Sequence, residues 1–405
     1  MANSFTSTDV YGIVNAMARE MFGANNTITA IDTSTFQTIG EKMLRSGYTS
    51  TLNALSYQIN RTVIKVERYQ GRFRLIMRTP AEWGGIEREI SFYAKPLQAS
   101  GNYNTDINPN QLDDGNAIDH YIINKKYPLE LNYIGSKILE YSDTTWLVQL
   151  RGAFRDEASF SSFLSGKLVD IANDIETKIE AENRLMVLNA IGATYNVGKA
   201  RQKVNLTAEF NSKYGTSYTT AQLLTTYLAD FVSFMVARIQ GDMELMRDRN
   251  ELFHIYPARN DDAGNALTLP RFTTPAMRRL ILYMPLIRDE EKNVFPSLFN
   301  DSYLKLENYE GVEYWQNPND PMAVSVTPNQ LDVSTGQSTN GTAVTLDNVV
   351  GLLFHRDALE MSVKAEDALT TPVNARGQYY NTFYHWNMSY KEDQTMPMIL
   401  YYMAD

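Results

Sequence analysis

Residues 157–191 read EASFSSFLSGKLVDIANDIETKIEAENRLMVLNAI, and this stretch decides the fold. Its apolar side chains recur every three or four residues, which is the spacing of one stripe along a helix. They are Phe160, Leu164, Leu168, Ile171, Ile175 and Ile179. Asp156 stands where an N-cap would and Gly192 follows the last residue, so the pattern predicts a helix over 157–191. At 1.5 Å per residue it would be roughly 50 Å long, a stiff backbone for something flat.

A basic segment followed by an acidic one lies before this helix. Thr62–Tyr69 and Arg72–Arg78 are strand-like and flank a Gln-Gly break, which predicts a hairpin. Residues 61–95 hold eight basic and four acidic side chains, whereas residues 97–119 hold four aspartates and no base. A solvated hairpin with uneven charge fits this pattern, and so does a long arm that pairs electrostatically with neighbouring subunits.

The rest of the chain mixes helical and strand-like segments. Residues 1–60 combine a short helical pattern at 10–21 with polar sequence and irregularly spaced apolar residues at 35–55, which predicts an arm with little core of its own. Further expectations are a helix at 221–239 after Thr219 and Thr220, a loop at 260–265, a buried element at 276–283, a helix at 289–299, a surface loop at 324–345, and aromatic strands at 377–386 and 398–402. Because strands and helices are segregated rather than alternating, the predicted fold class is α+β.

Composition narrows the class of protein further. The chain has 405 residues, of which 43% are hydrophobic, enough for a large domain or two to three smaller units. A formal net charge of −10 argues against a surface that binds nucleic acid throughout. The absence of cysteine excludes disulfides and thiolate catalysis. No signal-peptide pattern and no apolar run of about 20 residues occurs, so we expect a soluble protein that is made in a cytoplasm and does not enter a membrane.

Each catalytic or ligand-binding motif lacks a residue that its mechanism needs. Gly192–Ala200 lacks the first glycine and the magnesium-binding hydroxyl of a phosphate loop. Asp106–Asn110 begins like a calcium loop, but Gln111 and Ala117 replace its turn glycine and closing glutamate, which leaves at most a weak cation site. His355–Asp357 lacks the asparagine that follows in a kinase catalytic loop. The four histidines have no metal-ligand spacing. Scattered carboxylates leave a catalytic pair open, but the expectation is no enzyme, no cofactor and no metal site.

Three local runs carry a resemblance to a known family. Leu352–Leu359 (LLFHRDAL) looks like the segment that precedes the last peripheral strands in tailed-phage major capsid proteins. Asn374–Trp386 (NARGQYYNTFYHW) is similar to the Asn-x-Arg-Gly-x-Tyr aromatic run of short-tailed phages of the phi-twenty-nine kind, and Ser159–Leu164 (SFSSFL) looks like the same group. The order of arm, charged extension, long helix, α/β region and aromatic strand also resembles these proteins, which have the Hong Kong 97-type fold.

The resemblance implies an α+β fold of the Hong Kong 97 type with five parts. They are an N-terminal arm (1–60), an extended hairpin loop (61–127), a peripheral domain (128–242) with its spine helix at about 157–191, an axial domain (243–350) and a return to the peripheral domain (351–405).

The resemblance also implies a major capsid protein that assembles as hexamers and pentamers into an icosahedral head around double-stranded DNA. The implied location is the virion capsid, after assembly in the cytoplasm of the bacterial host, with no sequence-specific DNA contact. Because no long scaffolding-like segment precedes the arm, a separate scaffolding protein is expected beside the portal protein. The alternatives are an encapsulin-like nanocompartment shell and another virion structural protein.

Extended arms suit a subunit that meets many copies of itself, because an arm buries area on a neighbour that a compact domain does not reach. The basic candidates for such contacts are Arg61, Lys65, Arg68, Arg72, Arg74 and Arg78. Their acidic partners on a neighbouring copy are expected to be Glu176, Glu180 and Glu182 of the long helix, or the loop with Asp113 and Asp114. Each exposed pair would contribute only about 0 to 1 kcal/mol, so such contacts act through repetition.

Overall fold

The structure is a computed structural model of the 405-residue chain. It describes residues 7–23, 29–47, 50–51, 53–55, 71–79, 87–94, 125–134, 136–262, 264–288 and 308–405. The chain divides into two units. Unit 1 comprises Met1–Gly85, Gly135–Leu185 and Glu360–Tyr390, and unit 2 comprises Ile86–Ile134, Met186–Leu359 and Lys391–Asp405. Each unit is therefore assembled from segments that lie far apart in the sequence.

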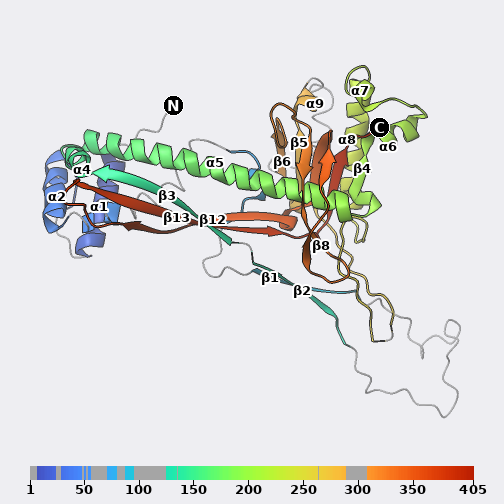
Figure 1. Ribbon diagram of the computed structural model, residues 1–405, viewed down its shortest axis with the longest axis horizontal. Helices are drawn as coiled ribbons and strands as arrows, with labels where there is room; N and C mark the ends of the chain where they lie inside the picture. The colour runs from blue at the N-terminus through green and yellow to red at the C-terminus, as the bar shows by residue number, and fades with distance from the viewer. Residues whose placement is uncertain are drawn as a thin grey trace, which may run out of the picture. The chain divides into compact units, whose positions relative to one another are not determined.

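Unit 1 is built on a three-stranded sheet of order β12 (Leu359–Thr370), β13 (Tyr379–Glu392) and β3 (Ser136–Trp146). The sheet lies along helix α5 (Glu157–Val197), as Figure 1 shows. Alternate residues of β13 are buried, from Tyr380 to Met388, because one face of the sheet turns toward the helix. The long helix predicted from the apolar stripe is confirmed, and Asp156 caps it by accepting a hydrogen bond from Ser159 N at 2.7 Å.

Three further helices complete the described core of unit 1: α1 (Ser7–Phe22), α2 (Thr33–Ser46) and α4 (Leu147–Ala153). Phe36 of α2 packs against Phe154 and Phe160, with ring centroids 6.3 and 5.8 Å away. These contacts contradict the expectation that residues 1–60 have little core, and the assignment of this segment as an arm stays a prediction. The buried face of α2 (Phe36, Ile39, Gly40 and Met43) has the i, i+3, i+4, i+7 spacing of a helix, which sequence reasoning overlooked.

The predicted strand at Arg72–Arg78 is also wrong. Arg74–Ile76 form a single 3₁₀ turn instead, entered through Phe73 with φ 62. Phe73 is fully buried, so tertiary packing holds a backbone conformation that few bulky residues adopt. The other predicted strand of that hairpin, Thr62–Tyr69, lies outside the described residues.

Unit 2 is built on a five-stranded sheet of order β4 (Lys203–Asn205), β14 (Met398–Tyr402), β11 (Val349–His355), β5 (Arg278–Tyr283) and β6 (Tyr309–Val312). β11 is antiparallel to both of its neighbours, and the two outer pairs are parallel. β5, β11 and β14 are almost wholly buried, as continuous apolar strands covered on both faces should be. The buried element and the terminal strands predicted from the sequence are thereby confirmed.

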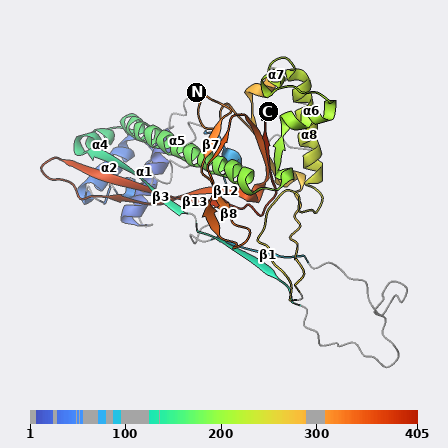
Figure 2. The ribbon, with the colours of Figure 1, turned by 45° about the vertical axis from the view of Figure 1, so that its right-hand side comes forward.

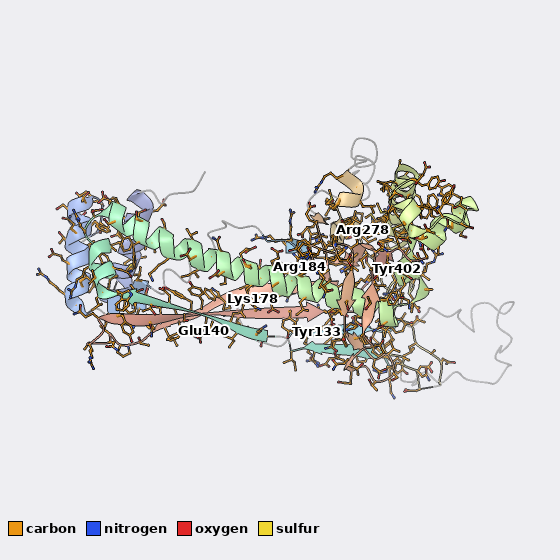
Figure 3. The ribbon with its side chains drawn as sticks, turned by 45° about the horizontal axis from the view of Figure 1, so that its top comes forward. Tyr133, Glu140, Lys178, Arg184, Arg278 and Tyr402 are labelled. Carbon is orange, nitrogen blue, oxygen red and sulfur yellow. The ribbon has the colours of Figure 1, made fainter. Side chains whose placement is uncertain are left out.

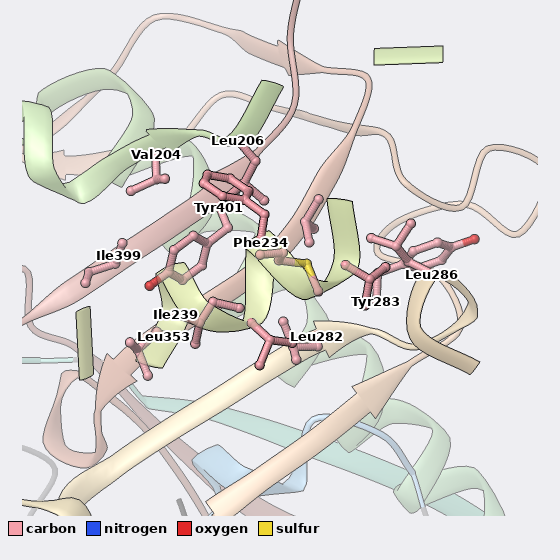
Figure 4. Packing of buried hydrophobic residues seen from close by; sticks show 14 of the residues in the cluster. Val204, Leu206, Phe234, Ile239, Leu282, Tyr283, Leu286, Leu353, Ile399 and Tyr401 are labelled. Atoms are coloured by element: carbon pink, nitrogen blue, oxygen red, sulfur yellow. The ribbon is translucent and has the colours of Figure 1, made fainter. Parts of the chain in front are cut away.

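Helices α6 (Leu206–Tyr214), α7 (Thr220–Leu223) and α8 (Leu228–Leu245) lie together beside this sheet (Figure 2). Figure 4 shows the resulting core, where Phe234 and Ile239 of α8 meet side chains of the sheet. The single helix predicted at 221–239 is wrong in one respect, because it is divided into α7 and α8. The Tyr218 and Tyr227 rings stack at 4.0 Å across this break.

Helix α5 continues beyond the end predicted for it. Gly192 lies inside the helix, which ends at Val197. A Cβ at Gly192 would lie 2.6 Å from Cγ1 of Val326, so this glycine permits a close approach and does not cap the helix. The motif considered as a phosphate loop is consequently mostly helical.

Short strands make up the rest of unit 2. β1 (Glu87–Phe92) and β2 (Pro128–Tyr133) form an antiparallel pair. The predicted surface loop at 324–345 instead contains β7 (Val324–Val326), β8 (Asn329–Leu331), β9 (Ser338–Asn340) and β10 (Val344–Leu346), paired β7 with β10 and β8 with β9. A short helix, α9 (Pro285–Arg288), follows β5, and the helix predicted at 289–299 lies outside the described residues. Among the helices that the structure describes, none is long and apolar enough to cross a membrane.

Candidate inter-subunit surfaces

The carboxylate of Glu176 is held within unit 1. Its Oε1 accepts hydrogen bonds from Gly71 N at 3.0 Å and from Arg74 Nε at 3.1 Å. The guanidinium of Arg74 and this carboxylate therefore form an ion pair inside one chain, although the sequence predicted such pairs between copies. Arg78 likewise forms an ion pair with Glu360 at the start of β12.

The two remaining predicted glutamates of α5 also have partners in their own unit. Glu180 accepts from Arg184 at 2.6 Å, and the Arg184 guanidinium lies 5.2 Å from the centre of the Phe73 ring. Glu182 lies 2.7 Å from Lys137 Nζ and 2.9 Å from Lys178 Nζ. Lys178 and Arg184 project from α5 in Figure 3.

The protonation of Glu182 follows from these contacts. Burial acts to raise the pKa of Glu182, but hydrogen bonds from Lys137 and Lys178 outweigh it, so the pKa is lowered. Glu182 is therefore a carboxylate at neutral pH, bound by two cations of its own chain. Its contribution to the subunit itself is a modest one, since partly exposed pairs are worth about 0 to 1 kcal/mol.

The predicted contact residues thus fall into three groups. Arg74, Arg78, Glu176, Glu180 and Glu182 make ion pairs inside unit 1. Arg72 is described and exposed, next to the 3₁₀ turn. Arg61, Lys65, Arg68, Asp113 and Asp114 lie outside the described residues. A role between copies stays a prediction for all eleven.

Sequence reasoning missed exposed apolar side chains on the outer face of the unit 1 sheet, where Glu140, Ser142 and Thr144 lie between those of β3. Tyr379 of β13 is the strand partner of Trp146 of β3. The two rings meet edge to face, with their centroids 5.3 Å apart. Trp146 is 48% exposed, and Ile138 further along β3 is 66% exposed. Leu369 of β12 is 60% exposed. The sequence of β3 did not reveal them, because three polar residues stand between Ile138 and Trp146 at the outward-facing positions.

A second group of exposed apolar side chains lies on the β1–β2 pair of unit 2. Ile90 and Phe92 are 48% and 56% exposed, and both lie on the face opposite to Glu89 and Ser91. On the same outer face, Arg88 forms an ion pair of 2.7 Å with Glu130 of β2. The outer face of the pair is thus apolar at one end and charged in the middle.

The run that carried the family resemblance folds into a tight turn before β13. Asn374 Oδ1 accepts hydrogen bonds from Arg376 N at 3.0 Å and Gly377 N at 2.8 Å. Gln378 has φ 50, and a Cβ at Gly377 would lie 2.5 Å from Cε1 of Tyr379. Each fixed residue of Asn-x-Arg-Gly-x-Tyr therefore has a local role, and the turn holds Arg376 exposed at its tip.

The motifs considered for chemistry have structural roles. His355 Nδ1 accepts from Asp357 N at 3.1 Å, which caps a 3₁₀ turn after β11. His254 is fully buried, and its Nε2 lies 2.6 Å from Leu269 O. Burial lowers the pKa of His254 to about 4, so this imidazole is neutral. Within the part of the chain that the structure describes, no group of three His, Cys, Asp or Glu residues is arranged to hold a metal ion.

Comparison with known proteins identifies the family. The family model described as Phi29-like phage major capsid protein matches residues 14–402. No curated protein sequence matches the chain.

Among solved structures, the capsid of Staphylococcus phage Andhra has a TM-score of 0.52 at 10% sequence identity, covering 84% of this chain and 86% of that one. A structure of the head fibre and inner core protein of native bacteriophage P68 has a TM-score of 0.49 at 9% identity, covering 84% and 86% of the two chains. The Andhra likeness confirms the predicted α+β fold of the Hong Kong 97 type. The chain belongs to the Phi29-like phage major capsid proteins, which build the heads of tailed phages and are not enzymes.

Proposed function

We propose that copies of this chain assemble as hexamers and pentamers, with a scaffolding protein and a portal protein, into an icosahedral head that encloses double-stranded DNA. As a major capsid protein, the chain is a component of the virion and forms a homo-oligomeric shell.

The observation that supports the mode of assembly is the exposure of large apolar side chains on a sheet surface in each of the two units. Soluble monomers rarely leave such patches in water unless something covers them. One face lies on the sheet of unit 1 (Trp146 and Leu369) and the other on the β1–β2 pair of unit 2 (Ile90 and Phe92). Two different surfaces on one chain allow a heterologous contact, in which one surface of a copy binds the other surface of the next copy. Such contacts form a closed ring when the rotation that relates neighbouring copies brings the last copy back to the first.

The division into parts follows the family resemblance and is likewise proposed. Residues 1–60 form the N-terminal arm and 61–127 the extended loop, with β1 at its base. Residues 128–242 form the peripheral domain with α5 as the spine helix, 243–350 the axial domain, and 351–405 the return to the peripheral domain. The pairing of β3 with β13 supports this return, because residues 136–146 and 379–389 share one sheet.

The predicted contact residues can be sorted by experiment. A residue that acts only inside the chain changes the stability of the free subunit, whereas one that acts between copies changes assembly at unchanged stability. Arg74→Gln should lower the melting temperature because Glu176 loses its cation. Arg72→Gln tests an exposed position nearby: a lower yield of shells at an unchanged melting temperature would assign Arg72 to contacts between copies.

The proposed cargo agrees with the charge of the chain. A net charge of −10 disfavours tight adhesion to phosphates, which suits a wall that faces packed DNA without sequence-specific contacts.

The test is electron microscopy of the chain expressed with the product of its upstream neighbouring gene. Closed shells of uniform size are expected, and a monodisperse monomer or small oligomer would contradict the proposal. A matched pair of variants locates the contact. Phe92→Ser should reduce the shell yield at least about tenfold, since aromatic side chains dominate interface energies. Ile31→Ser, which alters an exposed residue outside both faces, should leave it unchanged.

A further inference from the structure

The segment Lys391–Thr395, which joins β13 to β14, carries charged and polar side chains into the interior of unit 2. Asp393 and Thr395 are fully buried, and the side chain of Lys391 is only 7% exposed. Buried charges are costly unless they are paired, so their partners show what this segment holds.

Lys391 connects the segment to the inner face of the β1–β2 pair. Its Nζ lies 2.9 Å from Glu89 Oε2 and 3.8 Å from Glu87 Oε1, both on β1. The same ammonium lies 5.2 Å from the centre of the Tyr133 ring on β2, which Figure 3 labels. One cation therefore contacts both strands.

Arg271 makes a second connection between the same elements. The Nη2 atom of its guanidinium lies 3.8 Å from Glu89 Oε1 and 2.9 Å from Ser91 Oγ on β1. It also lies 3.3 Å from Thr395 Oγ1, within the segment itself. Glu89 is thus placed between two cations that reach it from different parts of unit 2.

Asp393 completes the cluster. Its Oδ1 accepts hydrogen bonds from Thr395 N at 2.8 Å and Thr395 Oγ1 at 2.7 Å, and its own N–H donates to Ala358 O at 2.8 Å. Burial raises the pKa of Asp393, and the charge of Glu89 adds to this. Burial, then the charges of Asp393 and Glu89, raises the pKa of Tyr133 as well. The inner face of the strand pair and the segment therefore share one electrostatic environment.

The apolar contacts of the strand pair form a small cluster at its base. It has three buried members, Tyr93, Leu129 and Leu269, and four partly buried ones, Tyr127, Leu131, Tyr256 and Leu267. So small a cluster fixes direction weakly, whereas a buried ion pair is favourable in one geometry only. If the strand pair turned away, water would solvate the separated charges, so the open state would not retain unpaired buried ions.

We propose that the contacts of Lys391 and Arg271 with Glu89 form a latch that sets the direction in which the β1–β2 pair leaves unit 2, and that opening the latch lets the pair turn. This inference rests on the proposed function, because the direction of the β1–β2 pair decides how its outer face contacts a second copy. The latch lies on the inner face, and the contact surface with Ile90 and Phe92 lies on the outer face.

The test compares two substitutions by methionine, each of which removes a cation that contacts one face of the β1–β2 pair. Lys391→Met removes the buried cation, and Arg88→Met removes the exposed ion pair with Glu130 across the outer face. Amide hydrogen exchange of β1 and β2 is measured on the full-length chain, as free subunit and in shells. We expect exchange about tenfold faster in Lys391→Met and less than about twofold faster in Arg88→Met, with β5 and β11 unchanged in both.

A second variant keeps the test decisive if Lys391→Met does not fold. Glu89→Gln retains the size of the side chain and removes its charge, and it should speed exchange in the same two strands. In the double variant the two effects should be less than additive, because both remove one interaction. Unchanged exchange in Glu89→Gln, or strictly additive effects, would overturn the latch.

The two proposals fail in different ways. Shells of normal size with unaltered exchange in the latch variants would remove the latch and leave the shell function standing. A wild-type chain that forms no shells would remove the proposed assembly, while exchange in the free subunit would still report on the latch.

Discussion

The two ends of helix α5 meet different surroundings within one continuous element. From Glu157 to Leu185, in unit 1, the helix buries one stripe and leaves residues such as Gly166 and Asp174 exposed. From Met186 to Thr194, in unit 2, every residue except Asn189 is buried. A helix on one sheet face needs a single apolar stripe, whereas a helix enclosed on all sides needs small or apolar residues all round.

This difference explains why the sequence pattern described only the first part well. The stripe of Phe160 and its successors has a helical period, but Met186–Thr194 has none to detect, since almost every position is apolar or small. The end predicted at Gly192 is wrong for the same reason. In enclosed surroundings a glycine is a packing residue, and in an exposed last turn it would be a cap.

The largest expected contrast comes from removing one aliphatic side chain at each end. Ile191→Ala should lower the free energy of unfolding by about 2 to 5 kcal/mol, because its side chain is fully buried and a cavity would remain. Leu185→Ala should cost less than about 0.5 kcal/mol, since Leu185 is 57% exposed. Urea unfolding of the two full-length variants measures both. Equal losses would show that the ends do not differ.

A methyl group added at the enclosed glycine should also be costly. In Gly192→Ala the new Cβ would meet Val326 Cγ1 at 2.6 Å and Pro328 Cβ at 3.1 Å. Relieving this overlap should cost about 1 to 3 kcal/mol, more than the gain in helix propensity. A lowered melting temperature is the expected result, and a raised one would mean that β7 and its loop yield easily.

Asn189, a polar residue at the enclosed end, predicts a pH effect. Asn189 Nδ2 donates to Glu392 Oε2 at 2.5 Å and Gln394 Nε2 donates to Glu392 Oε1 at 3.0 Å. Burial nevertheless raises the pKa of Glu392 to about 7. Between the ordinary glutamate pKa and pH 7 the folded chain holds more protons than the unfolded chain, so stability from this group is lost as the pH rises.

Glu392→Gln should remove that loss. Relative to the wild type, the variant should gain stability between pH 5 and 7, by at most about 1.4 kcal/mol per pH unit. Thermal unfolding at several pH values measures this, with Asp174→Asn at the exposed end as control. Parallel pH profiles for wild type and Glu392→Gln would refute the assignment.

The smallest effect is expected at the exposed glycine. A Cβ at Gly166 would meet nothing within 4 Å. Gly166→Ala should therefore stabilise the chain by about 0.5 to 1 kcal/mol, the difference in helix propensity. A rise in melting temperature is expected, opposite in sign to the effect at Gly192. A fall would indicate that this face of the helix is already covered.

Much of the fold could be predicted because its strongest elements have local patterns. The α5 stripe, the apolar β5 and the aromatic β13 and β14 each show their type within a short window. The α2 helix could also have been found, because Phe36, Ile39 and Met43 have helical spacing. The 3₁₀ turn after Phe73 could not, because it depends on tertiary packing.

The candidate surfaces were less predictable than the fold. The sequence placed the acidic residues Glu176 and Glu182 on α5. It did not show that Arg74 and Lys137 of the same chain form ion pairs with them. The exposed apolar side chains of the unit 1 sheet escaped notice because polar residues stand between them on β3. The Lys391–Thr395 cluster unites β1, β2 and a segment more than 250 residues later, a pairing that no local pattern encodes.

The strand order of the unit 2 sheet has a consequence for synthesis. β14 lies between β4 and β11, so the interior of the sheet remains open until residue 402 is available. The sheet of unit 1 likewise cannot be completed before β12 and β13 have been made. A nascent chain on the ribosome can therefore form α5 early but neither sheet. Both sheets can be completed only when the chain has been made as far as β13 and β14.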